Sequence, residues 1–224
     1  MEELQLIPVK TRILTPQDDI VDAIEQYAKD QIGPNDVVSV AESVVAITQG
    51  RAVRPEELNP GILARIMCRF VPQKGSMSSI YGMQAAMNVE GEWRMFFAML
   101  VGMLGKLIGR SGLFYELAGP QAALVDDVTG TMPPFDKHIV YGPDNPEGVA
   151  EAIKKRFGCY GAVVADVNDL KRARVVGITS GLEPQKVAKI LIDNPFGNAS
   201  QMTPVVIIRN YAQAEARVVE HSQA

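Results

Sequence analysis

Short apolar runs alternate along the chain with longer stretches in which apolar positions recur at helical spacing. Clusters of glycine, proline, asparagine and aspartate separate them and are typical of turns. We expect strands at residues 6–14, 37–41, 122–125, 138–141, 161–165, 175–178 and 204–208. We expect helices at residues 15–31, 43–48, 147–157 and 184–192, and a short turn or helix at 54–58. The pattern predicts an α+β fold with mixed sheets, packed helices and no internal repeat.

The first expected helix has a clear start signal in the sequence. Thr15 occupies the capping position, Pro16 the first helical position, and Asp18 and Asp19 the first turn. Proline suits the first position because its missing N–H would be unpaired there, and acids favour the positive end of the helix dipole. The sequence therefore predicts that this helix begins at Thr15.

A glycine- and methionine-rich stretch, residues 75–112, does not follow the alternation. Within it, the apolar run 95–105 is closed by Arg94 and Lys106, and it is shorter than the roughly twenty residues that cross a bilayer as a helix. Three glycines in or after the run would let another backbone approach closely: Gly102, Gly105 and Gly109. Three methionines recur at every fourth position, as in a packing stripe: Met95, Met99 and Met103. We expect a buried helix or a helix at a dimer interface, and no membrane span.

The domain organisation follows from this pattern. Residues 1–210 are expected to form one domain, with a possible subdivision near residues 75–112, and residues 211–224 a polar C-terminal tail. A chain of 224 residues with 47% hydrophobic residues can bury a core of this size. No low-complexity linker suggests a different boundary.

Composition excludes some classes of function. The net charge of −4 provides no basic surface for nucleic acid. Cys68 and Cys159 lack metal-ligand spacing and are expected to be small buried side chains, and the histidines, His138 and His221, are isolated. Because the N-terminus lacks the pattern of a signal peptide, we expect a protein of the reducing cytoplasm.

Two acidic segments, residues 124–130 and 163–169, each follow an apolar stretch. They could deliver the carboxylates of Asp126 and Asp166 to strand ends, where a divalent cation could bridge them. Aspartate at a strand end is also a common turn former or helix cap, and spacing alone leaves both interpretations open. Standard nucleotide-binding fingerprints are absent, and the segment 75–79 fits an exposed turn as well as a phosphate cradle.

The order of several segments resembles the family of gamma-glutamyl ligases that extend the deazaflavin coenzyme F420. Near the N-terminus, segments 7–10, 18–20, 36–45 and 49–53 resemble the start of the family pattern. Later, segments 122–126, 132–148 and 163–174 resemble its A-N-A-G-I-D, V-P-P and V-I-S-D motifs. The order and spacing agree over about two thirds of the chain, and the stretch 75–112 agrees poorly.

The resemblance implies a GTP-dependent ligase in which a substrate carboxylate is phosphorylated and L-glutamate attacks the acyl phosphate. It implies Mg²⁺ or Mn²⁺ held by Asp126 and Asp166, with Arg51 and Arg172 as candidates for contacting phosphate or substrate carboxylates. The expected substrates are L-glutamate and the deazaflavin precursor or a related carboxylate. A homodimer is expected as well.

Some positions depart from the family pattern: Ser43 and Ile47 stand for lysines, Ala122 for asparagine and Val167 for threonine. Two alternatives to a ligase stay open. These departures favour a relative that binds a nucleotide or small anion without ligation. The apolar segment 95–109 favours a structural, oligomer-forming protein.

Overall fold

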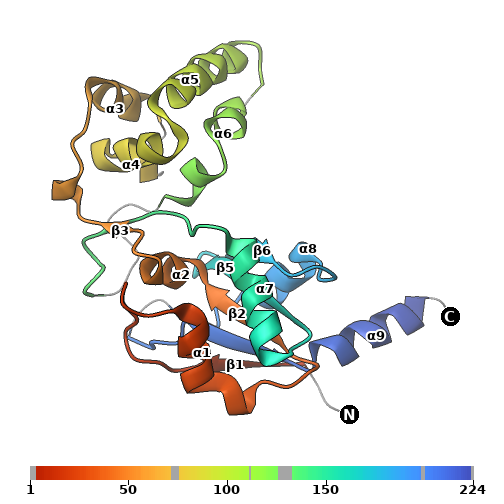
Figure 1. The fold of residues 1–224 in the computed structure, drawn as a ribbon. Helices are drawn as coiled ribbons and strands as arrows, with labels where there is room; N and C mark the ends of the chain where they lie inside the picture. The colour runs from red at the N-terminus through yellow and green to blue at the C-terminus, as the bar shows by residue number, and fades with distance from the viewer. Residues whose placement is uncertain (1–3, 72–75, 111, 126–132, 198–199, 223–224) are drawn as a thin grey trace. The chain divides into compact units, whose positions relative to one another are not determined.

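The computed structural model of the chain describes residues 4–71, 76–110, 112–125, 133–197 and 200–222. The chain folds into two compact units (Figure 1). The first unit contains residues 1–50 and 143–224, and the second contains residues 51–142. The second unit therefore has wider bounds than the subdivision expected near residues 75–112. Together the units form the α+β architecture that the sequence predicted.

A five-stranded mixed sheet forms the centre of the first unit. Its strands, in spatial order, are β1 (Gln5–Val9), β7 (Val205–Arg209), β2 (Val37–Ala41), β5 (Gly161–Asn168) and β6 (Arg172–Ile178). β2 and β5 are parallel, and the remaining pairs are antiparallel. The parallel pair lies inside the sheet, where both of its faces are covered, and this explains why Val37–Ala41 is apolar except for Ser39 and why β5 is apolar up to Ala165.

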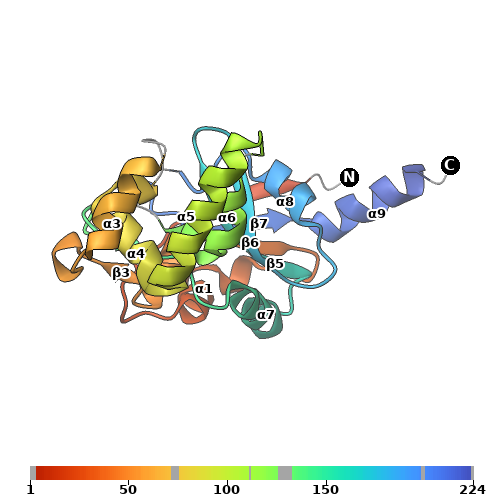
Figure 2. The ribbon, with the colours of Figure 1, turned by 90° about the horizontal axis from the view of Figure 1, so that it is seen from above.

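Helices cover both faces of this sheet (Figures 1 and 2). α1 (Ile20–Ala28), α2 (Glu42–Thr48) and α7 (Pro146–Phe157) pack on one face with Val38, Val40 and Val164. α8 (Pro184–Ile190) and the start of α9 (Tyr211–Ser222) cover the other face with Val37 and Val163. Successive strand residues thus alternate between two separate cores. The tail expected after residue 210 is a helix whose first residue, Tyr211, is buried.

α1 begins at Ile20, so the prediction of a start at Thr15 was wrong. Asp19 is the N-cap, and its carboxylate accepts hydrogen bonds from the amides of Val21 and Asp22 at 2.8 and 3.1 Å. The preceding residues form a turn instead, in which the Asp18 amide donates to the Thr15 carbonyl. The first strand likewise ends at Val9 rather than at residue 14.

The turn before α1 should make stability dependent on pH. The Arg12 guanidinium donates hydrogen bonds to Asp18 and lowers the pKa of that carboxyl from its usual 3.8 to about 2. A lowered pKa stabilises the fold above the unfolded value, and this contribution is lost as pH falls from about 4 to about 2. With Arg12 exposed, we expect Asp18→Asn to cost about 1 kcal/mol at pH 7. Urea unfolding should show this difference shrink by pH 2 to 3, and a constant difference would contradict it.

The second unit pairs two short strands, β3 (Ala52–Val53) and β4 (Ile139–Val140), with a group of helices. The helices are α3 (Ile62–Met67), α4 (Ile80–Glu90), α5 (Glu92–Leu107) and α6 (Leu113–Ala118). Their core is rich in methionine and alanine: Met83, Met87, Met95 and Met99 are buried together with Ala64, Ala86 and Ala98. Among the described residues, no helix is long and apolar enough to cross a membrane.

The strand expected at residues 122–125 is not formed, because Gln121–Leu124 is a short 3₁₀ helix. The Glu90 carboxylate of α4 accepts hydrogen bonds from the first amides of this 3₁₀ helix, Gln121 N at 2.7 Å and Ala122 N at 3.3 Å. An acid from α4 thus replaces the partner strand that an extended segment would need. The other expected strands and helices are present with shifted ends. Cys68 and Cys159 are buried and free, as expected.

The glycines of α5 bring this helix close to α6 (Figure 2). A Cβ at Gly102 would lie 2.8 Å from Phe114 Cβ, and one at Gly105 would lie 2.5 Å from Leu113 Cδ1. The close approach expected from the sequence therefore occurs within the chain, between two consecutive helices.

We expect Gly102→Ala to destabilise the second unit, because the contact with α6 has no room for a methyl group. The clash should cost about 1–3 kcal/mol, offset by roughly 1 kcal/mol of better helix propensity. Thermal unfolding followed by circular dichroism measures the net loss. Met103→Ala, at the exposed next position, is the control and should change stability little. A Gly102→Ala protein more stable than the parent would contradict this packing.

Candidate functional site

The carboxyl ends of the two parallel strands lie side by side in the first unit. Ala41 of β2 pairs with Ala165 of β5, so the next residues, Glu42 and Asp166, come at the same edge of the sheet. Ligands of open α/β sheets bind at the carboxyl ends of parallel strands. β5 continues to Asn168, and its pairing with β6 shifts register between Val164 and Ala165. Such irregularities often re-aim side chains next to functional sites.

Asp166 projects from this edge with a partly exposed side chain. It lies opposite Arg174 of β6, and Arg174 Nη2 is 3.8 Å from Asp166 Oδ2, with both side chains more than 40% exposed. At this distance and exposure the ion pair is weak, so the carboxylate remains accessible to a ligand. Arg172 is exposed two residues earlier on the same strand. Alternation along β6 places both arginines on one face of the sheet.

The hairpin that carries these residues closes with a tight turn. The Leu170 amide donates to Asn168 Oδ1 at 3.0 Å, and Lys171 adopts a left-handed conformation with φ 57°. A short loop ending in a left-handed residue is a common hairpin connection. The turn therefore fixes the register in which Asp166 faces Arg174 and Asn168 faces Arg172.

Glu42 is a site candidate that the sequence analysis missed. It is the first residue of α2, directly after β2, and only 8% of its surface is exposed. Its sequence position carries the same signal as that of Asp166, an acid after a buried apolar strand, and this signal could have identified it. Glu42 comes at the same edge of the sheet as Asp166. We therefore add Glu42 to the candidate site.

Arg51 belongs to the second unit, where its guanidinium makes hydrogen bonds and lies over an aromatic ring. Nε donates to the Gly142 carbonyl at 2.6 Å, Nη2 donates to Gln121 Oε1 at 3.4 Å, and the group lies 5.7 Å from the centre of the Tyr141 ring. The Arg51 carbonyl also accepts from the Tyr141 amide at 2.9 Å. These contacts hold the entry and exit of the second unit together. A role of Arg51 in binding phosphate stays a prediction.

Asp126, the other expected metal ligand, lies outside the described residues. Among those that are described, no group of three or more histidine, cysteine, aspartate or glutamate side chains could hold a metal ion. Mg²⁺ often uses one or two carboxylates together with substrate phosphates and water, rather than a full protein cage. The exposed Asp166 carboxylate fits this sparse mode of binding, which requires a substrate phosphate to complete the coordination.

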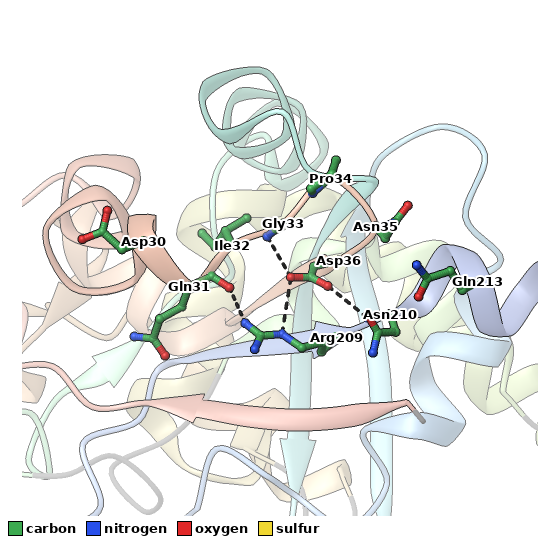
Figure 3. Close-up of a pocket in the computed structure, with 10 residues that line it drawn as sticks. All are labelled: Asp30, Gln31, Ile32, Gly33, Pro34, Asn35, Asp36, Arg209, Asn210 and Gln213. Atoms are coloured by element: carbon green, nitrogen blue, oxygen red, sulfur yellow. Dashed lines mark hydrogen bonds and ion pairs between the residues drawn. The ribbon is translucent and has the colours of Figure 1, made fainter. Parts of the chain in front are cut away.

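A pocket lies at the other end of the same sheet (Figure 3). It is formed around the start of β2 and the end of β7, where Val37 pairs with Ile208. Asp36 is 95% buried in its side chain and accepts hydrogen bonds from Gly33 N at 2.8 Å and Asn210 N at 2.9 Å. Arg209 donates to the Gln31 carbonyl and lies 3.8 Å from Asp36. These bonds connect the loop before β2 with the end of β7 and the residue before α9. We therefore interpret the pocket as a place where the fold is held together.

Comparison with known proteins identifies the family. The model of the family described as F420-0:gamma-glutamyl ligase matches residues 8–169 of the 224-residue chain. The match contains the whole second unit and Glu42, Asp126 and Asp166, whereas Arg172 lies just beyond it. No curated protein matches the chain in sequence. The match spans well over half of the chain, and the chain therefore belongs to the F420-0:gamma-glutamyl ligase family, a family of enzymes that form amide bonds.

Proposed function

We propose that this chain is a nucleotide-dependent ligase that joins L-glutamate to the carboxylate of the deazaflavin coenzyme precursor F420-0. The family match carries the proposal, and the carboxylate of Asp166 at the carboxyl end of a parallel strand supports it. In the proposed reaction an oxygen of the substrate carboxylate attacks the γ-phosphorus of GTP, and GDP leaves. The amine of glutamate then attacks the acyl phosphate, forming the amide and releasing phosphate and a proton.

The chain's own residues would act mainly by positioning and by balancing charge. Phosphoryl transfer depends on holding the phosphate in line and on stabilising its negative charge. Arg172 is exposed on β6 beside the candidate site, and its guanidinium can bind a phosphate or a carboxylate through two parallel hydrogen bonds. Arg174 is already directed toward Asp166 and would limit the repulsion between that carboxylate and an incoming anion.

A divalent cation, Mg²⁺ or Mn²⁺, would be held by Asp166 together with Asp126 and the nucleotide phosphates. When bound, the ion would neutralise negative charge on the phosphates. Glu42 is a further carboxylate at the same sheet edge and would hold the position of the ion or of its water ligands.

A second candidate is a family member that binds a nucleotide without ligating glutamate. Val167, which stands where the family pattern has threonine, packs with the apolar cluster under α8 and offers no hydroxyl to the site. Because Ser43 and Ile47 stand where the family pattern has lysines, α2 lacks two positive charges that the pattern would place there. Both candidates require nucleotide binding, and only the ligase requires product formation.

Isothermal titration calorimetry with GTP and then ATP, each with Mg²⁺, Mn²⁺ or no metal, tests the shared requirement. The proposal expects metal-dependent binding of at least one nucleotide. The absence of binding under all of these conditions would contradict both candidates.

The acyl phosphate can be tested separately with ¹⁸O in the acceptor carboxylate. One labelled oxygen is expected in the released phosphate, because that oxygen bonds to phosphorus in the first step. Unlabelled phosphate accompanying amide formation would exclude this route.

A further inference from the structure

The helix α5 has one face in the core and an opposite face that is apolar and exposed. Met95, Ala98 and Met99 pack in the core of the second unit, and Gly102 and Gly105 lie against α6. The opposite face carries large apolar side chains, all of them exposed: Trp93, Phe97, Leu100, Val101, Leu104, Leu107 and Ile108. The exposed fraction reaches 83% at Leu107, so packing within the unit does not account for these side chains.

The neighbouring helix α3 and the 3₁₀ turn that follows it extend this apolar face. Ile62, Ile66 and Phe70 recur at every fourth position and are exposed by 76, 50 and 60%. Ala64 and Met67 lie in the same core into which α5 packs. α3 contacts α5, and the two helices lie side by side in Figures 1 and 2. We call the ten exposed apolar side chains of α3, its following turn and α5 the α3–α5 surface.

The α3–α5 surface is too large to be scattered exposure. Its ten side chains expose apolar area on the order of 1,000 Å². The largest apolar patch of a typical soluble monomer is about 300–600 Å², and larger patches mark sites that bind a protein or a membrane. The surface therefore requires an occupant.

The part of the chain that carries this surface is basic, although the chain as a whole is acidic. From the start of α3 to Arg110 there are six lysines and arginines against two acids, a net charge of +4 in a chain whose net charge is −4. Arg65 and Arg69 are exposed between the apolar residues of α3 and its turn, and Lys106 and Arg110 are exposed at the end of α5. Of the two acids, Glu90 is nearly buried and bonded within the unit. The charge that surrounds the surface is therefore mainly positive.

An anionic lipid surface matches this combination. Helices that lie in the surface of a membrane insert tryptophan, phenylalanine and leucine between the headgroups and acyl chains, and place lysine and arginine beside the headgroups. A helix that lies there is only partly inserted and does not need the length of a membrane span. A second copy of this chain is a poorer match, because a two-fold interface would bring the same arginines close to one another.

We infer that the α3–α5 surface docks this protein on membranes that contain anionic lipids. The apolar side chains of both helices would insert at the boundary between headgroups and acyl chains, with Arg65 and Arg69 at the lipid phosphates. Docking does not depend on the proposed ligase activity, because the exposure and charge of two helices carry it. A dimer formed through another face would leave this surface free.

The fluorescence of Trp93 provides a direct test, since it is the single tryptophan of the chain and lies on this surface. The full chain is titrated with vesicles of phosphatidylcholine and phosphatidylglycerol, and with vesicles of phosphatidylcholine alone. We expect the emission to shift to the blue with the anionic vesicles, because the indole ring leaves water. Co-sedimentation with these vesicles should weaken at least about 10-fold when salt rises from about 0.1 to about 0.5 M. Unchanged emission together with no co-sedimentation at low salt would overturn the inference.

Two variants test the apolar and the basic part of the surface separately. Leu107→Glu should bind anionic vesicles at least about 10-fold more weakly, because it places a charge in the apolar layer of the lipid. Replacing Arg65 and Arg69 by glutamine should weaken binding about 25-fold, since each basic residue near an anionic surface is worth about five-fold. Leu170→Glu is the control, the same substitution at a residue that is 75% exposed in the first unit, and it should bind like the parent.

Circular dichroism shows whether the variants are folded, which their exposed positions favour. Parental binding by Leu107→Glu, or by the variant without the two arginines, would contradict docking through this surface. Light scattering covers the alternative occupant. A parent that is a dimer, is dissociated by Leu107→Glu and does not bind anionic vesicles would assign the surface to a second copy of the chain and overturn the inference.

Discussion

Asp166→Asn is expected to lower kcat/KM for glutamate addition by about 100-fold or more while leaving the fold intact. The substitution removes the charge that would hold a cation against the nucleotide, and loss of one such electrostatic contribution commonly costs this much. The fold should survive because the Asp166 side chain is 43% exposed and its ion pair with Arg174 is long, at 3.8 Å. Steady-state kinetics at saturating metal measure the effect, and thermal unfolding checks the fold.

Asp193→Asn is the control for this experiment. Asp193 is 74% exposed and pairs with Lys171 in the turn of the same hairpin, outside the candidate site. Its substitution should leave kcat/KM close to that of the parent. Equal activity of the parent and Asp166→Asn would remove Asp166 from the metal site and leave Glu42 as the candidate carboxylate among the described residues.

The second large effect is expected at Asp36, at the other end of the sheet (Figure 3). Both carboxylate oxygens accept hydrogen bonds, Oδ2 from Gly33 N and Oδ1 from Asn210 N. Asparagine has one oxygen and one NH₂ group, so Asp36→Asn would place a donor against a backbone donor in a buried site. We expect a loss of about 2–3 kcal/mol and a melting temperature lower by about 5–10 °C.

Asp30→Asn provides the matched comparison, since Asp30 lines the same pocket with an exposed side chain. The two variants carry the same chemical change, and only Asp36→Asn should be destabilised. If the two melt alike, the Asp36 carboxylate does not hold this junction together. If Asp36→Asn also lost nucleotide binding without loss of stability, the pocket would belong to the ligand site.

The elements that the sequence predicted best are those whose pattern depends on burial alone. β2 and β5 are apolar along their buried length apart from Ser39, and α7 has Asn145 as its N-cap and Gly158 in a left-handed conformation at its end. The prediction that the methionines of the run 95–105 form a buried packing stripe was right for Met95 and Met99 and wrong for Met103, which is 41% exposed. The apolar pattern of α5 identifies a helix but does not distinguish the face that packs in the core from the face that is exposed.

The misplaced elements depend on contacts that no local pattern carries. Thr15 looks like a helix cap, but the bond between Arg12 and Asp18 folds that segment into a turn and leaves Asp19 as the cap. The segment at Ala122 looks extended, yet a carboxylate from α4 satisfies its amides. Glu90 lies 32 residues before Ala122 in the sequence, and Arg12, although only three residues before Thr15, falls within the strand expected at residues 6–14.

The candidate site was predictable only in part. Asp166 was identified because it follows an expected buried strand, while Glu42 has the same pattern but lies between the strand expected at residues 37–41 and the helix expected at 43–48, and it was not considered. Its proximity to Asp166 follows from the pairing of β2 with β5, strands more than 100 residues apart in the chain. Arg51 was chosen from the family pattern, and its bonds to Gly142 and Gln121 show a structural role that spacing does not reveal.

The most direct test of the central claim is a product assay by mass spectrometry. The purified full-length chain is incubated with F420-0, L-glutamate, GTP and Mg²⁺ or Mn²⁺, with each component omitted in turn. The account predicts a product heavier than F420-0 by one glutamyl residue, formed together with GDP and phosphate and absent when glutamate or nucleotide is left out. Metal-dependent nucleotide binding without any such product, under conditions where Asp166→Asn loses the binding, would contradict the ligase and leave a nucleotide-binding relative in its place.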